Sequence, residues 1–220
     1  RAAGHSAYVV GGCVRDSLLG RLPGDWDICT SARPDEMKAL FHDQRLILTG
    51  EKHGTVAVIL HGKPYEMTTY RLDGSYRDHR HPDNVQFVDD LAADLARRDF
   101  TINAMAWSLN AGSFGELVDP FDGMDDLEEC VIRTPCDPDV TFSDDPLRMM
   151  RAVRFASQLG FTIEGETFDA IRRNAHRIRI VSRERIAAEL NKIVLSPVPS
   201  MGFELLELCL LYTSPSPRDA

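Results

Sequence analysis

Apolar positions in the first half of the chain follow strand and helix periodicities in turn. Residues 8–10 are an apolar run that predicts a strand leading into a double glycine. Residues 55–60 and 65–70 are rich in β-forming residues, and the four residues between them include Gly and Pro, which predicts a hairpin. Residues 31–41, with a proline near their start, and residues 89–96 predict helices. This half is therefore expected to be α/β.

The pattern changes in the second half, because strand signals disappear from about Phe142 onward. Ser182 is suited to cap a helix that runs to Leu195, and residues 201–211 continue the helical pattern. An apolar row at helical spacing precedes them, formed by Leu147, Met150, Val153, Ala156 and Leu159. The second half is therefore expected to be helical.

Three segments are indicated by this pattern: a head of residues 1–136, a helical part of residues 137–211, and a tail of residues 212–220 that breaks the apolar pattern. Within the head, residues 70–82 are polar and rich in Arg, Asp and His, which predicts a mobile loop. The chain begins at Arg1 without a methionine, so its true N-terminus is expected to be missing. The tail is left out of the functional argument.

Composition indicates a protein with a real core, since 43% of the 220 residues are hydrophobic. No segment is apolar and long enough to span a membrane, and no signal peptide is visible. The five cysteines have no C-x-x-C spacing, which argues against a zinc site or a disulfide framework. We therefore expect a reduced, cytoplasmic location.

Charge is unevenly distributed around a net value of −9. Residues 89–145 are strongly acidic, whereas residues 171–192 are basic and could grip a phosphate backbone, although a solvated helix face is an equally good interpretation of any one arginine. Asp78, His79 and His81 suggest a metal cluster or a phosphohydrolase fragment. This alternative is weak, because no further spaced His–Asp partners occur after them.

A double glycine, Gly11-Gly12, begins the most informative stretch of the chain. Glycine lets backbone amides approach a ligand closely, and the helix expected after it has an N-terminus that favours phosphate. Arg15 lies in that helix and supplies a cation, although it could also be a surface arginine paired with Asp16. A Gly-Gly pair alone usually indicates only a turn, so whether this one binds phosphate depends on the residues that follow it.

Asp25 and Asp27 come about fifteen residues later, in what is expected to be a strand. Both side chains would then leave the same face, while Trp26 would point the other way into a core. Two adjacent carboxylates repel each other unless a cation lies between them, and Mg²⁺ is the oxygen-seeking cation that fits. An Asp-x-Asp pair is often only a solvated strand end. Beside a phosphate-binding turn, it predicts phosphoryl or nucleotidyl transfer.

The order of these and later motifs resembles the class II tRNA nucleotidyltransferases (CCA-adding enzymes) and the bacterial poly(A) polymerases. The later motifs are Gly54-Thr55-Val56 and residues 66–71, 97–104, 119–123 and 144–148, and the resemblance covers about residues 8–208. It implies an α+β fold: a polymerase-β-like nucleotidyltransferase head with a small mixed sheet and flanking helices, then an all-α neck.

The resemblance also implies the reaction and its catalytic residues. An RNA 3′-hydroxyl attacks the α-phosphate of a nucleoside triphosphate, and two Mg²⁺ ions assist. Asp25 and Asp27 are implied as metal ligands, and Glu66, on the second strand of the hairpin, is the candidate third carboxylate. The alternative for Glu66 is an ordinary strand glutamate.

Nucleotide binding is implied for residues of two motifs. Gly11, Gly12 and Arg15 match the motif that holds the triphosphate. Arg98 and Asp99 match the motif that holds the sugar of the incoming nucleotide, where an aspartate accepting from a 2′-hydroxyl would favour ribonucleotides.

Base choice is predicted from Asp145, Arg148, Arg151 and Arg154, which recur every three residues on an expected helix. The first three share a broad face, and Arg154 is rotated away. Aspartate only accepts hydrogen bonds and arginine only donates them, so Asp145 and Arg148 complement C and A but not G or U. The alternative is a structural ion-pair ladder, which is strongest for Arg154.

Three functions are compatible with these motifs. The first is template-independent CCA addition to the tRNA 3′ end from CTP and ATP, and the second is a poly(A) polymerase or A-only adding enzyme. The third, from another class, is a non-catalytic nucleotide- or RNA-binding module, which would not need a metal pair. Family members continue with further helical domains, so this chain is expected to bind nucleotide but to grip tRNA poorly.

Overall fold

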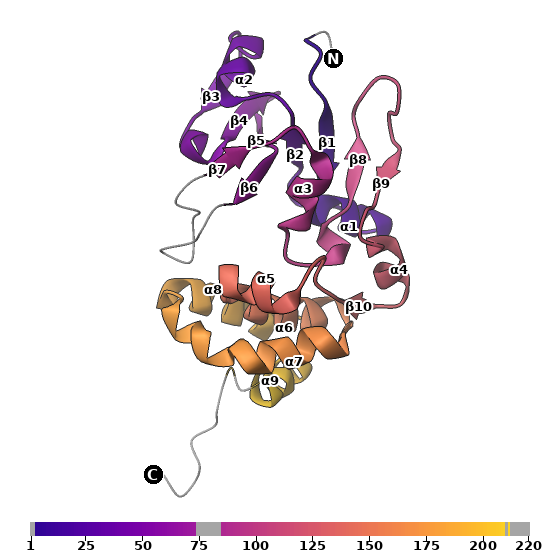
Figure 1. Ribbon diagram of the computed structural model, residues 1–220, viewed down its shortest axis with the longest axis vertical. Coiled ribbons are helices and arrows are strands. Elements are labelled where there is room, and N and C mark those ends of the chain that lie inside the picture. Colours follow the sequence, from indigo (N-terminus) through magenta and orange to yellow (C-terminus); the bar gives the residue numbers. More distant parts are fainter. Residues whose placement is uncertain (1–2, 74–84, 210, 212–220) are drawn as a thin grey trace, which may run out of the picture. The chain divides into compact units, whose positions relative to one another are not determined.

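The computed structural model describes residues 3–73, 85–209 and 211 (Figure 1). These residues form two compact units, which divide between Met124 and Asp125. The division lies earlier than the boundary expected after residue 136, because β10 at Val131–Ile132 pairs with a strand of the second unit. The tail expected at residues 212–220 lies outside the described residues.

A seven-stranded mixed sheet forms the centre of the first unit, in the order β3-β4-β5-β2-β1-β8-β9 (Figure 1). Its strands are β1 Ala7–Val10, β2 Asp27–Thr30, β3 Arg45–Ile47, β4 Thr55–Leu60, β5 Lys63–Thr69, β8 Ala106–Ser108 and β9 Leu117–Val118. Only β2 and β5 pair in parallel; the other neighbours are antiparallel. The expected strand at residues 8–10 and the expected hairpin are confirmed.

The β4–β5 hairpin closes through a two-residue turn, since Leu60 pairs directly with Lys63. His61 and Gly62 have φ angles of 49° and 79°, the left-handed conformation that a type I′ turn requires at both positions. This two-residue loop sets the register between β4 and β5. The register determines which β5 residues lie beside the start of β2.

Short helices flank the sheet. They are α1 Gly12–Leu18, α2 Pro34–Leu40 and α3 Leu91–Ala96, with 3₁₀ turns η1 Glu51–His53 and η2 Thr101–Asn103. Met37 of α2 packs with Val56 and Val58 of β4 in one core, whereas Leu95 of α3 packs with Val10 and Cys29 in another. Both expected helices, at residues 31–41 and 89–96, are present with shorter bounds.

The loop expected over residues 70–82 is partly a strand. β6 at Arg71–Asp73 pairs antiparallel with β7 at Val85–Phe87. Residues 74–82 lie outside the described part of the chain. The polar composition concealed β6, because three residues are too few to show an alternating pattern.

The second unit is built around α6, whose buried face includes Met149, Ala152, Val153 and Ala156. Its helices are α5 Pro138–Asp144, α6 Leu147–Leu159, α7 Gly165–Asn174, α8 Arg183–Val194 and α9 Pro199–Leu208, with a 3₁₀ turn η3 Ala175–Ile180; α4 Gly123–Glu128 crosses from the first unit. The Ser182 hydroxyl accepts from Arg185 N at the start of α8, as predicted.

One strand of the second unit was not expected. β11 at Thr162–Ile163 pairs in parallel with β10, so the prediction that strands end before Phe142 is wrong at this point. None of the helices in residues 3–73 and 85–209 is long and apolar enough to cross a membrane.

Candidate active site

The β1–α1 turn is built on Gly11, whose φ of +80° is accessible to glycine at little cost. Its amide donates to the carbonyl of Met105, and its own carbonyl accepts from Val14 N and Arg15 N. A Cβ on Gly11 would lie 3.0 Å from Nη1 of Arg98. Because residue 11 has no side chain, the Arg98 guanidinium can lie against the backbone of this turn.

Asp25 and Asp27 lie at the start of β2, but only Asp27 belongs to the strand. Both residues are exposed. Trp26, expected in a core, is 39% exposed because it precedes the strand and is not buried by the sheet. The expectation for Trp26 is therefore wrong, whereas Asp25 and Asp27 remain accessible to a ligand.

Electrostatics couple the two aspartates. Although the residue is exposed, neighbouring atoms partly desolvate the Asp27 carboxyl and raise its pKa; the cation of Arg98 opposes this shift, and the charge of Asp25 adds to it. Like charges that affect each other in this way are stabilised by a cation between them. The pair is therefore chemically suited to a divalent metal, with Arg98 close enough to neutralise part of its charge.

Glu66 lies in register with Asp27 on the neighbouring strand β5. Residues paired across a sheet project from the same face, so Glu66 is on the Asp27 side, opposite Tyr65 and Met67. Within the described residues, no group of three or more His, Cys, Asp or Glu side chains is placed to hold a metal. Asp25 is close enough to Asp27 to raise its pKa, and the role of Glu66 as a third carboxylate remains a prediction.

A pocket of about 350 Å³ lies beside Asp25. Its lining residues are Leu22, Pro23, Gly24, Asp25, Trp26, Lys63, Pro64 and Tyr65. The pocket combines aromatic, apolar and cationic side chains at the N-terminal end of β2.

Arg15 is buried, with 8% of its surface exposed, and is not the surface arginine of the alternative interpretation. Its Nε and Nη2 donate to Asp16 Oδ1, and its Nη1 donates to Asn103 Oδ1 at 2.7 Å. Asn103 Nδ2 in turn donates to Asp99 Oδ1 at 3.0 Å. This chain of contacts ties the glycine turn to η2 and brings together the two motifs that are predicted to bind nucleotide.

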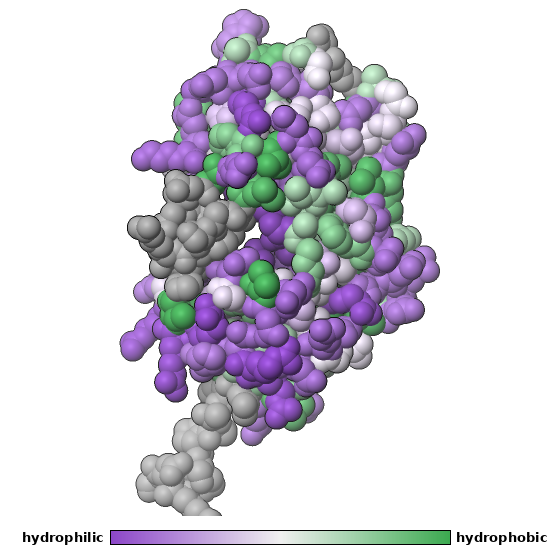
Figure 2. Space-filling view, in the orientation of Figure 1, coloured by the Kyte–Doolittle hydropathy of each residue, from purple (hydrophilic) through white to green (hydrophobic). Residues whose placement is uncertain are grey.

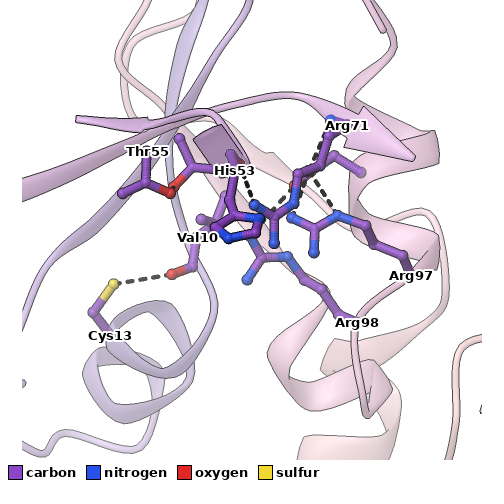
Figure 3. A network of polar contacts seen from close by, with 9 residues as sticks. Val10, Cys13, His53, Thr55, Arg71, Arg97 and Arg98 are labelled. Atoms are coloured by element: carbon purple, nitrogen blue, oxygen red, sulfur yellow. Dashed lines mark hydrogen bonds and ion pairs between the residues drawn. The ribbon is translucent and has the colours of Figure 1, made fainter. Parts of the chain in front are cut away.

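Arg71, Arg97 and Arg98 lie close together (Figure 3). Each of them donates to Asp94 of α3, Arg71 through its backbone amide. Asp94 Oδ1 accepts from the Arg71 amide and from Nε and Nη2 of Arg97, and Oδ2 accepts from Nη2 of Arg98. Arg71 also donates to the His53 carbonyl. The sequence analysis did not single out Asp94: Arg97 and Arg98 lie three and four residues after it, but its contact with Arg71 joins separate segments.

In the second unit, Asp145 lies between α5 and α6 in an extended conformation and not on a helix as expected. Its Oδ1 accepts from Leu147 N at 3.1 Å, and its Oδ2 accepts from Arg185 Nη2 at 2.7 Å. Pro146, the next residue, starts α6 and prevents α5 from continuing through Asp145. Arg185 was considered only as part of the basic stretch at residues 171–192, and its contact with Asp145 was not predicted from the sequence.

The arginines of α6 differ in their surroundings. The Arg151 guanidinium lies 5.5 Å from the ring centre of Phe155. Arg154 is 7% exposed, donates to Glu189 Oε2 and stacks 3.9 Å from the same ring. These Arg154 contacts are those of a structural ion pair, although the partner is Glu189 of α8 and not an acid of the head. Nucleotide binding by Arg148, Arg151 and Arg154 remains a prediction.

The basic stretch at residues 171–192 lies on α7, η3 and α8. Figure 2 shows hydrophilic residues gathered over this helical unit. Arg172, Arg179 and Arg183 are exposed, whereas Arg173 is held by Asp139 at 2.6 Å.

Comparisons with known proteins match both units. The family model of the poly(A) polymerase head domain matches residues 7–133, and a model described as a probable RNA and SrmB-binding site of polymerase A matches residues 160–214. The CCA-adding enzymes of Lactiplantibacillus plantarum and Anoxybacillus flavithermus are both 49% identical to the chain, over 96% and 92% of its length.

Solved structures agree. The Bacillus stearothermophilus CCA-adding enzyme in complex with CTP has a TM-score of 0.86 at 42% identity and matches 96% of this chain. The Thermotoga maritima CCA-adding enzyme complexed with tRNA has a TM-score of 0.80 at 30% identity and matches 97%. The chain spans about half the length of each of these four relatives. The polymerase-type head followed by a helical unit, predicted from the motifs, is confirmed, and the chain belongs to the CCA-adding enzyme family.

Proposed function

We propose that this chain adds C and A nucleotides to the 3′ end of tRNA without a nucleic-acid template, taking them from CTP and ATP. One observation carries the proposal: Asp27, in register with Glu66 and close enough to Asp25 for that charge to raise its pKa, is also within the field of Arg98, whose Nη1 lies against the Gly11 turn. The relatives named above support the choice of CTP and tRNA, since their structures were determined with these ligands.

The donor set at the start of β2 fits magnesium, because it consists of accessible carboxylate oxygens. Asp25 and Asp27 would hold the metal, with Glu66 as a candidate third carboxylate, and two ions are expected. Bound magnesium supplies activation of the attacking hydroxyl and neutralisation of charge on the leaving pyrophosphate.

The residues of the head bind and orient the nucleotide. Gly11 and Gly12 leave room for phosphate oxygens to approach the backbone, and Arg98 donates to them. Arg15 holds this turn against Asn103, and Asp99 is the candidate acceptor for the 2′-hydroxyl. Holding the α-phosphate and the RNA hydroxyl in one geometry removes much of the entropic cost of their reaction.

The choice of base is assigned to Asp145 and Arg148. A carboxylate that accepts from an exocyclic amino group and a guanidinium that donates to a ring nitrogen complement both C and A. Arg185, through its 2.7 Å contact, holds the Asp145 carboxylate in one orientation before a nucleotide arrives. The same pair leaves buried polar groups of G or U unmatched.

A nucleotide-feeding assay on tRNA that lacks CCA tests this function. With CTP, ATP and Mg²⁺, the proposal requires C and A to be incorporated and extension to end after three nucleotides. An unbounded A tail would instead identify a poly(A) polymerase or A-only adding enzyme.

The matched variants are Asp27→Asn, which removes one metal ligand, and Asp43→Asn, which changes an exposed aspartate elsewhere in the head. We expect D27N to abolish incorporation and D43N to leave it unchanged. If the parent and D43N both bind CTP and tRNA yet neither extends the tRNA, the non-catalytic binding module is the correct interpretation.

A further inference from the structure

Asp94 is a fully buried carboxylate in the head, with 0% of its residue surface exposed. A buried charge is tolerated only when it is paired and hydrogen-bonded, and Asp94 meets this condition with donors from three arginines. Arg71 comes from β6, whereas Arg97 and Arg98 follow the C-terminal end of α3 (Figure 3). One helix residue therefore anchors three arginines, of which Arg98 lies against the glycine turn.

The two oxygens of Asp94 are used unequally. Oδ1 accepts from the Arg71 amide and from two nitrogens of Arg97, at 2.8–3.2 Å. Oδ2 accepts from Nη2 of Arg98 at 3.4 Å. Arg97 and the β6 backbone thus fix the carboxylate, and the fixed carboxylate holds one corner of the Arg98 guanidinium.

Two other nitrogens of the Arg98 guanidinium group differ in their surroundings. Nη1 lies against the glycine turn, since a Cβ added to Gly11 would be 3.0 Å from it. Nε is buried, and no acceptor within the described residues lies at hydrogen-bonding distance from it. A guanidinium offers five N–H donors in a rigid plane, so holding Nη2 orients the others.

We propose that Asp94 is a positioning residue for the incoming nucleotide, holding the Arg98 guanidinium over the Gly11 turn so that it can receive the triphosphate. This inference rests on the proposed function, since it takes a nucleoside triphosphate as the ligand. Asp94 touches no substrate and acts through Arg98. Without the charge of Asp94, the Arg98 side chain would have to be ordered when the nucleotide binds, and this ordering cost lowers the affinity.

Calorimetric titration of CTP and of cytidine in the presence of Mg²⁺ tests the proposal on three variants. Asp94→Asn keeps the side-chain shape but turns an amide toward Arg98, so its Kd for CTP should rise by about tenfold or more. Its affinity for cytidine should fall less than its affinity for CTP, because cytidine lacks the triphosphate that the positioned Arg98 would receive. Asp94→Glu keeps the charge, and binding should recover most of the loss.

The matched control is Asp90→Asn on the same helix. Asp90 caps α3 by accepting from Ala92 N, and asparagine caps a helix equally well, so CTP binding should not change. A double-mutant cycle separates positioning from folding: in an Arg98→Ala background, D94N should add little further loss, since Asp94 then has no Arg98 to hold.

Three results would overturn the inference while leaving the proposed function intact. The first is a D94N protein that is folded and binds CTP as the parent does. The second is a loss of CTP affinity that persists in full in the R98A background, which would indicate a general structural role. The third result applies if D94N does not fold. In that case, a folded D94E protein that binds CTP no more tightly than R98A does would overturn the inference. A parent chain that binds no CTP would overturn the inference and the proposed function together.

Discussion

The carboxylate of Asp27 is affected both by the like charge of Asp25 and by the cation of Arg98. An ordinary solvated strand end does not show this combination. Burial raises the pKa of Asp27, Arg98 lowers it and Asp25 raises it further. Carboxylates perturbed by both burial and specific charges are concentrated at functional sites. At the residue scale, this observation favours a metal-binding pair over a chance Asp-x-Asp.

Asp145→Asn should relax base choice. The asparagine amide can donate as well as accept, so the acceptor-only face that rejects uracil is lost. We expect the ratio of CTP to UTP incorporation on tRNA lacking CCA to fall by about tenfold or more, in line with the discrimination a polar pocket provides.

Asp139→Asn serves as the control for this change, because Asp139 is another carboxylate of the second unit held by an arginine. An unchanged CTP to UTP ratio in D145N would remove Asp145 from base selection.

The residues that the sequence revealed lie in short motifs, whereas those it missed depend on contacts between distant segments. Gly11, Asp25 and Asp27 were recognisable from spacing alone. The Arg71 amide binds Asp94 across 23 positions, and Asp145 binds Arg185 across 40, so no local pattern announces either contact. Such pairs are set by the tertiary fold.

At the scale of elements, Gly123 fixes the start of α4 against η2. A Cβ there would lie 2.4 Å from the Thr101 carbonyl oxygen, which is backbone and cannot rotate away. Gly123→Ala should therefore lower the free energy of unfolding by about 1–3 kcal/mol, the usual cost of overpacking. Chemical denaturation measures this, and Gly112→Ala, with open space around its Cβ, should change little.

Helices α6 and α8 are joined by Arg154 and Glu189, both buried. Burial alone would raise the pKa of Glu189, but Arg154, Lys192 and Arg151 together lower it below its usual value. A carboxyl with a depressed folded-state pKa contributes stability above its unfolded pKa of about 4.3, and this contribution is lost as pH falls through the folded value.

Glu189→Gln should therefore lower the free energy of unfolding at pH 7 by about 3 kcal/mol, since it leaves Arg154 buried without its counter-charge. It should also remove part of the decline in stability seen on acidification below about pH 4. Denaturant titrations at pH 7 and pH 3.5 measure both effects, with Glu184→Gln, exposed on the same helix, as control. Equal acid sensitivity in E189Q and parent would contradict this account.

Elements with several alternating or helically spaced apolar residues were predicted well from the sequence, including the β4–β5 hairpin and α6. The pair β10–β11 was missed, because each strand has two residues and their pairing joins segments about thirty residues apart. Trp26 was misplaced because β2 begins one residue after it.

At the scale of the whole molecule, an acidic net charge of −9 coexists with an exposed basic surface on the second unit. Replacing Arg172, Arg179 and Arg183 by Gln should weaken tRNA binding and reduce its salt dependence. The slope of log K against log salt should fall by about 0.7–0.9 for each phosphate that the protein no longer neutralises. Arg173→Gln, already engaged by Asp139, should have a smaller effect. An unchanged slope in the triple variant would place the RNA elsewhere.

A crystal structure of this chain with CTP and Mg²⁺ tests the central claim most directly. The account predicts magnesium within about 2.1 Å of carboxylate oxygens from both Asp25 and Asp27, with the triphosphate against the Gly11–Gly12 backbone and Arg98. Triphosphate bound away from that turn, or magnesium held by neither aspartate, would contradict it.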